Sequence, residues 1–338
     1  MTYPELAVTG IGNAIVDILS QIDEAFVTAE GFAKGSMSLI DAERALALSN
    51  HLSASMQTSG GSAANTIAGL ASLGSTAGYI GKVGADALGR VFSDAMRGQS
   101  VVFSTLPSVS GTPTARCVVL VTPDAQRTMC TYLGACVELG PEDIDVELIQ
   151  QSRVTYLEGY LWDPPKAKEA FLVAANAAHA AKRQVSLSLS DSFCVGRHRD
   201  SFLELVRGHI DVLFANETEL LSLYQGSDFK SAMAVAKNQC RITAVTCGAK
   251  GCIVAVDGEI IEVPAEPVSE VVDTTGAGDL FAAGFLHGLS LGRSARDCAV
   301  LGSVAAAEVI SHFGARPERS LAKLVAARFG NNGNQLSI

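Results

Sequence analysis

The chain has 338 residues, of which 48% are hydrophobic and 18% are charged, and its formal net charge is -10. This apolar content is ample for a packed core and excludes intrinsic disorder as the overall state. The acidic balance excludes an extended nucleic-acid interface, which needs a basic surface, although a small phosphorylated ligand needs only a few local dipoles.

Short β-branched runs alternate with longer Ala- and Leu-rich segments along most of the chain. The runs that predict strands are, in order, 6–12, 154–157, 184–189, 212–215, 242–246 and 252–256. The segments that predict helices are 41–53, 63–73, 165–181, 202–207, 276–291, 293–311 and 318–329. This alternation predicts an α/β fold with a doubly wound, mostly parallel sheet and helices on both faces. Because no long linker or internal repeat occurs, we expect one domain over residues 1–338.

Segments 13–40 and 112–133 interrupt the α/β alternation. They read as short strands joined by turns, for example over 115–121 and 127–133. In an α/β enzyme such excursions can form a small β-sheet that folds over the site as a lid. Ordinary edge strands are an equally good interpretation of these residues alone.

The strongest local signal is Gly276-Ala277-Gly278-Asp279 at the start of an apolar helix. The first amides of a helix lack internal partners and lie at the positive end of its dipole, and glycines let an anion approach them. Asp279 in the first turn is placed to take a proton from a hydroxyl while the amides hold a phosphoryl group. The alternative is that Asp279 only interacts with the helix dipole, with a preceding threonine as N-cap.

A second glycine-rich segment, Gly60-Gly61-Ser62, also precedes a helix, and Asn65 follows in its first turn. Hydroxyl and amide groups suit a neutral polyol, because Asn offers both donors and acceptors. The alternative is that Ser62 is an N-cap and Asn65 is an ordinary polar residue of the first turn.

A third segment, residues 10–17, approaches a dinucleotide fingerprint but fails it, because Ile15 stands where the third glycine is required. Asn13 and Asp17 remain as polar groups in an apolar run. A carboxylate in such a run is costly to bury without a partner, and a substrate diol would serve as one.

Four ordered motifs resemble the PfkB/ribokinase family of carbohydrate kinases. They are Gly60-Gly61 with Asn65, Asn216-Glu217-Thr218-Glu219, Thr246-Cys247-Gly248-Ala249-Lys250-Gly251 and Asp273 to Asp279. Within this family, the opening over residues 12–17 and the Gly60-Gly61-Ser62 triplet are most similar to those of adenosine kinases. The resemblance therefore implies a ribokinase-like fold and an ATP-dependent kinase that phosphorylates the 5′-hydroxyl of adenosine to give AMP. A sugar kinase acting on ribose, fructose or a related sugar, or a broader purine-nucleoside kinase, is the alternative.

The resemblance also implies roles for residues near the transferred phosphoryl group. Asp279 would be the general base, and Gly276, Ala277 and Gly278 would form the anion hole. Arg127 would be an arginine of the lid near the phosphates.

On the acceptor side, the resemblance implies that Asp17 binds the ribose 2′- and 3′-hydroxyls. Asn13, Gly61, Ser62 and Asn65 would assist it.

An adenine ring also needs an apolar slot, since ligand pockets are mostly apolar. The sequence offers Met37, Leu39, Tyr160 and Leu161 as candidates, although each of them could equally be part of the core.

On the nucleotide side, the resemblance implies that Asn216, Thr246, Gly248 and Gly251 contact ATP. Asn216 and Glu219 would also organise Mg²⁺ through water, because Mg²⁺ keeps much of its hydration shell. The resemblance further allows a monovalent cation, typically K⁺, near Asp273 and Thr275.

The cysteine usage and the N-terminus bear on the compartment. The eight cysteines form no C-x-x-C pair, which is typical of buried thiols in a reducing cytosol. No Lys or Arg precedes the first apolar run, so no signal peptide is expected, and no run approaches the ~20 residues of a membrane span. We expect a cytoplasmic protein whose partners are small molecules rather than nucleic acid or membrane, and whose state is monomer or homodimer.

Overall fold

The computed structural model describes residues 3–52, 56–124 and 126–330. Its main sheet has eight strands in the order β13-β12-β11-β10-β9-β8-β1-β5. The bounds are β1 Leu6–Ile11, β5 Ala77–Ile80, β8 Ser152–Glu158, β9 Gln184–Ser188, β10 Val212–Asn216, β11 Ile242–Thr246, β12 Cys252–Val256 and β13 Glu259–Val263. The six strands from β11 to β5 are parallel, and β12 and β13 add an antiparallel edge. The predicted doubly wound, mostly parallel sheet is therefore confirmed.

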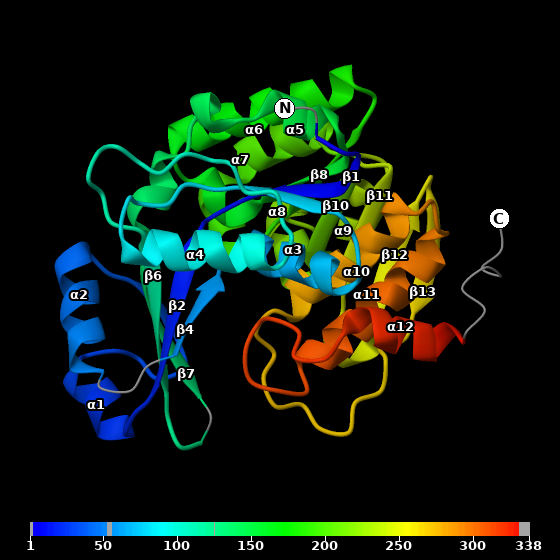
Figure 1. The fold of residues 1–338 in the computed structure, drawn as a ribbon. Helices are drawn as coiled ribbons and strands as arrows, with labels where there is room; N and C mark the ends of the chain where they lie inside the picture. Colours follow the sequence, from blue (N-terminus) through cyan, green and yellow to red (C-terminus); the bar gives the residue numbers. More distant parts are fainter. Residues whose placement is uncertain (1–2, 53–55, 125, 331–338) are drawn as a thin grey trace.

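Helices cover both faces of the main sheet, also as expected (Figure 1). One face carries α5 Val146–Gln150, α6 Pro165–Ala180, α7 Ser192–His209, α8 Glu217–Tyr224 and α9 Phe229–Ala236. The other carries α3 Ser62–Ser72, α4 Ala87–Gly98, α10 Ala277–Ser290, α11 Ala295–Val309 and α12 Leu321–Phe329. Small residues allow close packing between the central helices. A Cβ on Gly302 of α11 would lie 2.7 Å from the Phe281 carbonyl oxygen of α10.

A second, small sheet has five strands in the order β3-β7-β6-β2-β4. Its strands are β2 Ile15–Gln21, β3 Met37–Leu39, β4 Met56–Gly60, β6 Ala115–Val121 and β7 Arg127–Tyr132. The segments 13–40 and 112–133 supply four of these strands, so they form a separate sheet and are not edge strands of the main sheet. Their description as strands and turns was wrong at one place, because α1 (Glu24–Ala29) is a short helix within the first segment.

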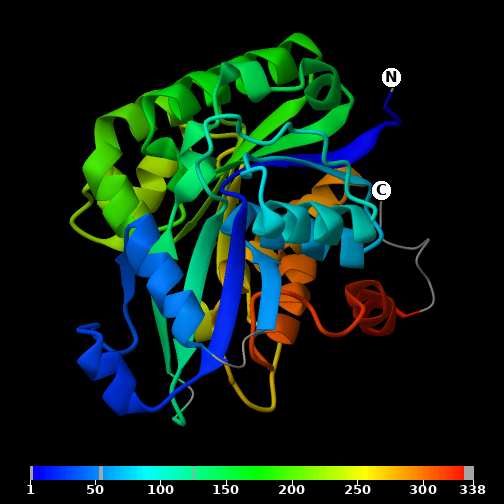
Figure 2. The same ribbon diagram turned by 60° about the vertical axis from the view of Figure 1, so that its left-hand side comes forward.

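The two faces of the small sheet differ in what they contact. Val118 and Leu120 of β6 pack under α1 and α2 (Ala42–His51), with Val27 and Leu48 as their helix partners. Since side chains alternate along a strand, Asp17 and the other odd-numbered residues of β2, β6 and β7 lie on the opposite face. Figures 1 and 2 show that this face is turned toward the main body, while α1 and α2 lie on the far side.

Several elements differ from the sequence prediction in extent. The helix expected over 202–207 begins ten residues earlier as α7, where the Asp191 side chain accepts a hydrogen bond from the Cys194 amide. Strands β4 and β5 and helices α5, α8 and α9, each of at most eight residues, were not predicted, and neither was the 12-residue amphipathic helix α4. In the part of the chain that the structure describes, no helix is long and apolar enough to cross a membrane.

Candidate active site

Polar residues gather at the carboxyl ends of the parallel strands. Asn13 follows β1, Glu158 ends β8, Asn216 ends β10 and Thr246 ends β11. The chain order reverses between β1 and β8, which are hydrogen-bonded neighbours in the sheet. In open α/β sheets, ligands bind at the carboxyl ends of strands at such a reversal. The topology therefore gathers these predicted residues at one edge of the main sheet.

Asp279 lies in the first turn of α10 and is held from α3. Its Oδ1 accepts a hydrogen bond from Ser62 Oγ at 2.6 Å, and its Oδ2 accepts one from Asn65 Nδ2 at 3.1 Å. Desolvation raises the pKa of Asp279 to about 6, although these two donors and the charge of Arg316 oppose the rise. An aspartate with this pKa is mostly ionised at neutral pH and is still basic enough to accept a proton.

The alternatives of a threonine as N-cap of α10 and of Ser62 as N-cap of α3 were wrong. The N-cap of α10 is Gly276, and Thr275 Oγ donates instead to Asp273 at 2.7 Å. The N-cap of α3 is Gly61, and Ser62 is engaged with Asp279. Neither side chain caps its helix: Ser62 bridges α3 and α10, and Thr275 binds within the loop before α10.

The loop before α10 is fixed by Asp273 and by a glycine. Asp273 accepts hydrogen bonds from the amides of Thr275 and Gly314, each at 3.0 Å. Gly276 has φ +80°, and a Cβ there would lie 2.8 Å from the Cα of Ala315. Only glycine fits this position, because the backbone is left-handed and a Cβ would overlap Ala315.

A cavity of about 600 Å³ opens on one side of this loop. Thr246, Gly248 and Gly251 line it together with Ala277 and Gly278. Its remaining lining is largely apolar: Ala265, Glu266, Pro267, Val268, Ala249, Val271, Thr274, Phe281, Ser303, Ala306, Ala307 and Ile310. Three of the four residues predicted to contact ATP therefore meet two residues of the predicted anion hole in one cavity, while the fourth, Asn216, is not part of its lining.

Asn216 and Glu219 form a reciprocal cap at the start of α8. The Glu219 amide donates to Asn216 Oδ1 at 2.8 Å, and the Asn216 amide donates to Glu219 Oε2 at 2.9 Å. Burial raises the pKa of Glu219 to about 7. Among the described residues, no group of three His, Cys, Asp or Glu side chains could hold a metal ion. The side-chain oxygens of both residues accept hydrogen bonds within this cap, so a Mg²⁺ bound mainly by phosphates would be reached from here only through its waters.

Asp17 and the glycine-rich segment meet on the other side of Asp279. A Cβ on Gly60 would overlap the Oδ2 of the Asp17 carboxylate. A Cβ on Gly61, which has φ +97°, would likewise overlap the Asn13 carbonyl oxygen. Desolvation raises the pKa of Asp17 to about 6, and the negative charge of Asp279 adds to the rise. The structure thus brings together the residues predicted to bind a polyol, next to the predicted base.

Glu158 is a site residue that the sequence analysis missed. Its buried carboxylate accepts hydrogen bonds from Asn13 Nδ2 at 2.7 Å, from the Asn13 amide at 3.3 Å and from the Ala63 amide at 2.7 Å. Burial raises its pKa to about 7. The available signal was an acidic residue directly after the apolar strand pattern 154–157.

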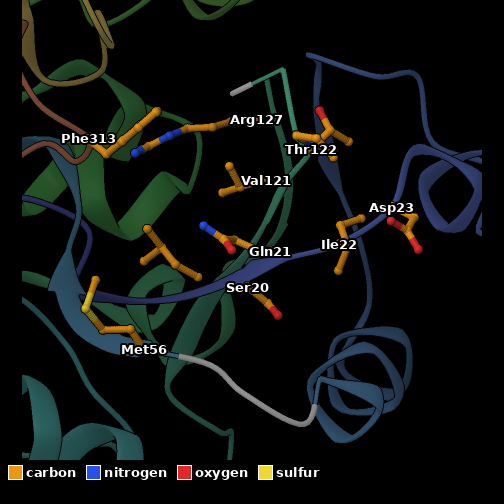
Figure 3. A pocket seen from close by; sticks show the side chains of 11 residues that line it. Ser20, Gln21, Ile22, Asp23, Met56, Val121, Thr122, Arg127 and Phe313 are labelled. Carbon is orange, nitrogen blue, oxygen red and sulfur yellow. The ribbon is translucent and has the colours of Figure 1, made fainter.

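Arg127 reaches from the small sheet to the main body. Its guanidinium lies 2.8 Å from Asp273, and the two side chains are only 11% and 9% exposed. It also lies over the Phe313 ring, 5.8 Å from the centroid. Figure 3 shows Arg127 extending alongside Phe313, with Gln21 and Val121 on the same side of the small sheet. These residues line an open cavity of about 1010 Å³ between the small sheet and the main body.

The candidate adenine contacts divide into two groups. Met37 and Leu39 are 48% and 61% exposed on the face of the small sheet that is turned toward the main body, and Tyr160 is 39% exposed beyond β8. Leu161 is fully buried in the core cluster with Trp162, so for this residue core packing is the correct interpretation.

Arg316 is the second residue that the sequence analysis missed. It lies between α11 and α12, and its Nε donates to Asn65 Oδ1 at 3.3 Å. Burial lowers its pKa to about 10, while the charges of Asp17 and Asp279 oppose that change. No motif pointed to it, since it follows a predicted helix in a short polar segment.

Comparison with known proteins gives a consistent result. The pattern of the pfkB family of carbohydrate kinases matches residues 34–321. Adenosine kinase from Sinorhizobium meliloti is 50% identical in sequence, with a TM-score of 0.88 over 96% of this chain and 99% of that one. A probable sugar kinase from Rhizobium etli is 48% identical, with a TM-score of 0.89 over 97% and 99%. Adenosine kinase from Schizosaccharomyces pombe is 29% identical over 245 residues, 66% of this chain and 70% of its own length.

Proposed function

The chain belongs to the pfkB family of carbohydrate kinases, and on that premise we propose that it transfers the γ-phosphoryl group of ATP to the 5′-hydroxyl of adenosine. Membership makes it a phosphotransferase with a hydroxyl group as acceptor. The choice of adenosine, and the role of each residue, are the proposal.

The position of Asp279 is the observation that carries the proposal. It lies between the cavity of about 600 Å³ on one side and the Asp17 and Asn13 cluster on the other. A base at this boundary can receive the proton of a hydroxyl that attacks a phosphoryl group held at the start of α10.

In the proposed reaction, the ionised Asp279 accepts the proton of the 5′-hydroxyl as its oxygen bonds to the γ-phosphorus. The bond from that phosphorus to the bridging oxygen of ATP breaks, and ADP leaves. Gly276, Ala277 and Gly278 stabilise the transferring group through the helix-start amides, and Arg127 adds positive charge. Asp17, with Asn13, Gly61, Ser62 and Asn65 around it, would hold the ribose diol.

Two cations enter the proposal with different support. Mg²⁺, held by the ATP phosphates and through water by Asn216 and Glu219, would neutralise phosphate charge. K⁺ near Asp273 and Thr275 stays a prediction, because the Arg127 guanidinium already lies 2.8 Å from the Asp273 carboxylate. Thr246, Gly248 and Gly251 would line the pocket that holds the nucleoside part of ATP.

The face of the small sheet supports a nucleoside over a free sugar. Met37 and Leu39 expose apolar surface on the face that is turned toward the main body, and Tyr160, which is 39% exposed, lies beyond β8. A sugar alone offers nothing to cover such surface, whereas a purine ring does. We also propose that residues 1–338 act as one unit and that the small sheet, built largely from 13–40 and 112–133, closes as a lid.

Phosphoryl transfer from ATP to a panel of acceptors tests this proposal. We expect adenosine to give the highest kcat/KM, ahead of guanosine, inosine, cytidine, ribose and fructose. Preference for a free sugar would reject the nucleoside assignment and retain the kinase. The matched variant Leu39→Ser should lose adenosine affinity and leave ribose phosphorylation unchanged, since ribose would not reach that surface.

A further inference from the structure

The turn between α11 and α12 contacts the loop before α10, the lid arginine and helix α3. The Gly314 amide donates to Asp273, Ala315 packs on Gly276, and Phe313 lies under Arg127. The Arg316 side chain continues from this turn to Asn65. The family motifs considered above do not include this turn.

The backbone of the turn is anchored on both sides. On the far side of Arg316, buried Glu308 accepts hydrogen bonds from the amides of Glu318 at 3.1 Å and Arg319 at 2.8 Å. On the near side, the Gly314 amide is bound to Asp273. The backbone that carries Arg316 is therefore held at both ends, which an accurately placed side chain requires.

The hydrogen bond from Arg316 determines how the Asn65 amide is oriented. Because Oδ1 accepts from Arg316 Nε, Nδ2 is left to donate to Asp279. The reverse orientation would place an amide oxygen against a carboxylate and an amide N–H against a guanidinium, which is unfavourable at both ends. The chain Arg316–Asn65–Asp279 therefore has one stable arrangement.

The charge of Arg316 is also directed at the carboxylates. Its Nη2 is buried and has no hydrogen-bond partner among the described residues. The negative charge of Asp279 reaches five titratable groups and raises the pKa of each: Asp17 of β2, Tyr156 and Glu158 of β8, Tyr160 beyond β8 and Glu219 of α8. Arg316 is the cation that lowers the pKa of Asp279 in this surrounding.

We propose that Arg316 is the positioning residue of the catalytic base: it orients Asn65 against Asp279 and keeps Asp279 ionised at neutral pH. This rests on the proposed function, in which Asp279 accepts the proton. Arg316 does not touch the reacting atoms in this role, so its effect should appear in the pH dependence of turnover.

The test measures kcat at saturating adenosine and ATP between pH 5.5 and 9. Arg316→Gln keeps a hydrogen-bond donor and loses the charge, whereas Arg316→Lys keeps the charge. Loss of an opposite charge at close range changes the pKa of a carboxyl by about 1–3 units, so the acidic limb of kcat should move up by about that amount in Arg316→Gln. In Arg316→Lys the limb should stay near its wild-type position. Arg319→Gln, exposed in the same turn, is the control and should match the wild type.

The use of kcat separates Asp279 from Asp17, which Arg316 also faces. In the saturated enzyme the substrate diol would occupy Asp17, so the limb of kcat reports the base, and changes at Asp17 would appear in kcat/KM. The proposal would be overturned if folded Arg316→Gln kept the acidic limb of kcat at its wild-type pH. It would also be overturned if Arg316→Lys shifted that limb upward as far as Arg316→Gln does. If Arg316→Gln does not fold, Arg316→Met removes the same charge with an unbranched side chain, and the same upward shift of the acidic limb is expected of it.

Asp279→Asn in the same assay tests the role of Asp279 as the base separately from the role of Arg316. Loss of turnover in Asp279→Asn with a wild-type limb in Arg316→Gln would reject the role of Arg316 alone. Wild-type turnover in Asp279→Asn would reject the base, and the role of Arg316 with it.

Discussion

Replacing Asp279 by Asn should make the protein more stable and nearly inactive at the same time. The substitution keeps the shape of the side chain and removes its charge. The new amide can still accept from Asn65 Nδ2 through its oxygen and donate to the Ser62 hydroxyl, which is able to accept. The site therefore keeps its hydrogen bonds and loses only the partly buried charge.

The size of the gain in stability follows from the pKa of Asp279. A rise from 3.8 to about 6 on folding corresponds to about 3 kcal/mol (about 2.2 × 1.36) of unfavourable free energy for the ionised form. Since the carboxyl group keeps some contact with solvent, we expect about 1–2 kcal/mol of this to be gained. Below pH 3.8 the group is protonated in both states, so the gain is absent there. It grows as the pH rises and is complete above about pH 6.

Urea unfolding of wild type and Asp279→Asn at pH 5 and pH 7.5 measures this difference. The variant should gain more at pH 7.5 than at pH 5, while turnover falls by roughly 10²–10⁴-fold, the usual contribution of a positioned base. Ser62→Ala is the matched control: it removes one donor from Asp279 and should lower stability rather than raise it, by about 1 kcal/mol. A difference in stability that does not depend on pH, or a destabilised Asp279→Asn, would refute the argument that desolvation determines the state of this group.

Three further predictions concern other parts of the site. Glu158→Gln places an amide NH₂ among three N–H donors. We therefore expect the free energy of unfolding in urea to fall by about 1–3 kcal/mol and the KM for the nucleoside to rise. An unchanged KM would show that Glu158 does not position Asn13 for the nucleoside. Gly276→Ala forces a Cβ against Ala315 at φ +80°, so it should lower the free energy of unfolding by about 1–3 kcal/mol and remove most of the activity. Gly278→Ala has open space around its Cβ, so it should keep its stability and lose only activity. Equal stability of the two variants would argue against strain at Gly276. Adenosine should slow hydrogen exchange of the β2, β4, β6 and β7 amides and leave β9 and β10 unchanged; identical exchange with and without adenosine would argue against closure of the small sheet.

The parts of this molecule that sequence reasoning reached are those with a local pattern. Most strands of the main sheet are apolar runs because both faces are covered by helices, so they are visible without any tertiary information, whereas β5, with only four residues, was missed. Gly276 to Asp279 is equally visible, since the requirement for glycine and an acid at a helix start is local. Four of the five strands of the small sheet were indicated for the same reason, while β4, with its exposed Met56 and Gln57, has no apolar period.

The residues that sequence reasoning missed act through contacts between distant segments. Glu158 and Asn13 are 145 residues apart, and Arg316 and Asn65 are 251 apart. Nothing near Arg316 in the sequence distinguishes it from a surface arginine, because its burial depends on how the turn after α11 docks on the loop before α10. Its position follows from packing that only the fold specifies.

The same packing explains how an acidic protein can hold phosphates. Asp17, Glu158, Glu219 and Asp279 each have a raised pKa, and Asp279 contributes to the rise in the other three. A cation that enters this cluster stabilises the ionised form of several carboxylates at once and so lowers their pKa values together. It is therefore bound more favourably than by one carboxylate alone. In the proposed function, a nucleotide that arrives with Mg²⁺ would bring the charge that the cluster lacks, while Arg127 and the helix-start amides would face its phosphates. The net charge of -10 is then compatible with phosphoryl transfer, because the attraction needed is local to one edge of the main sheet.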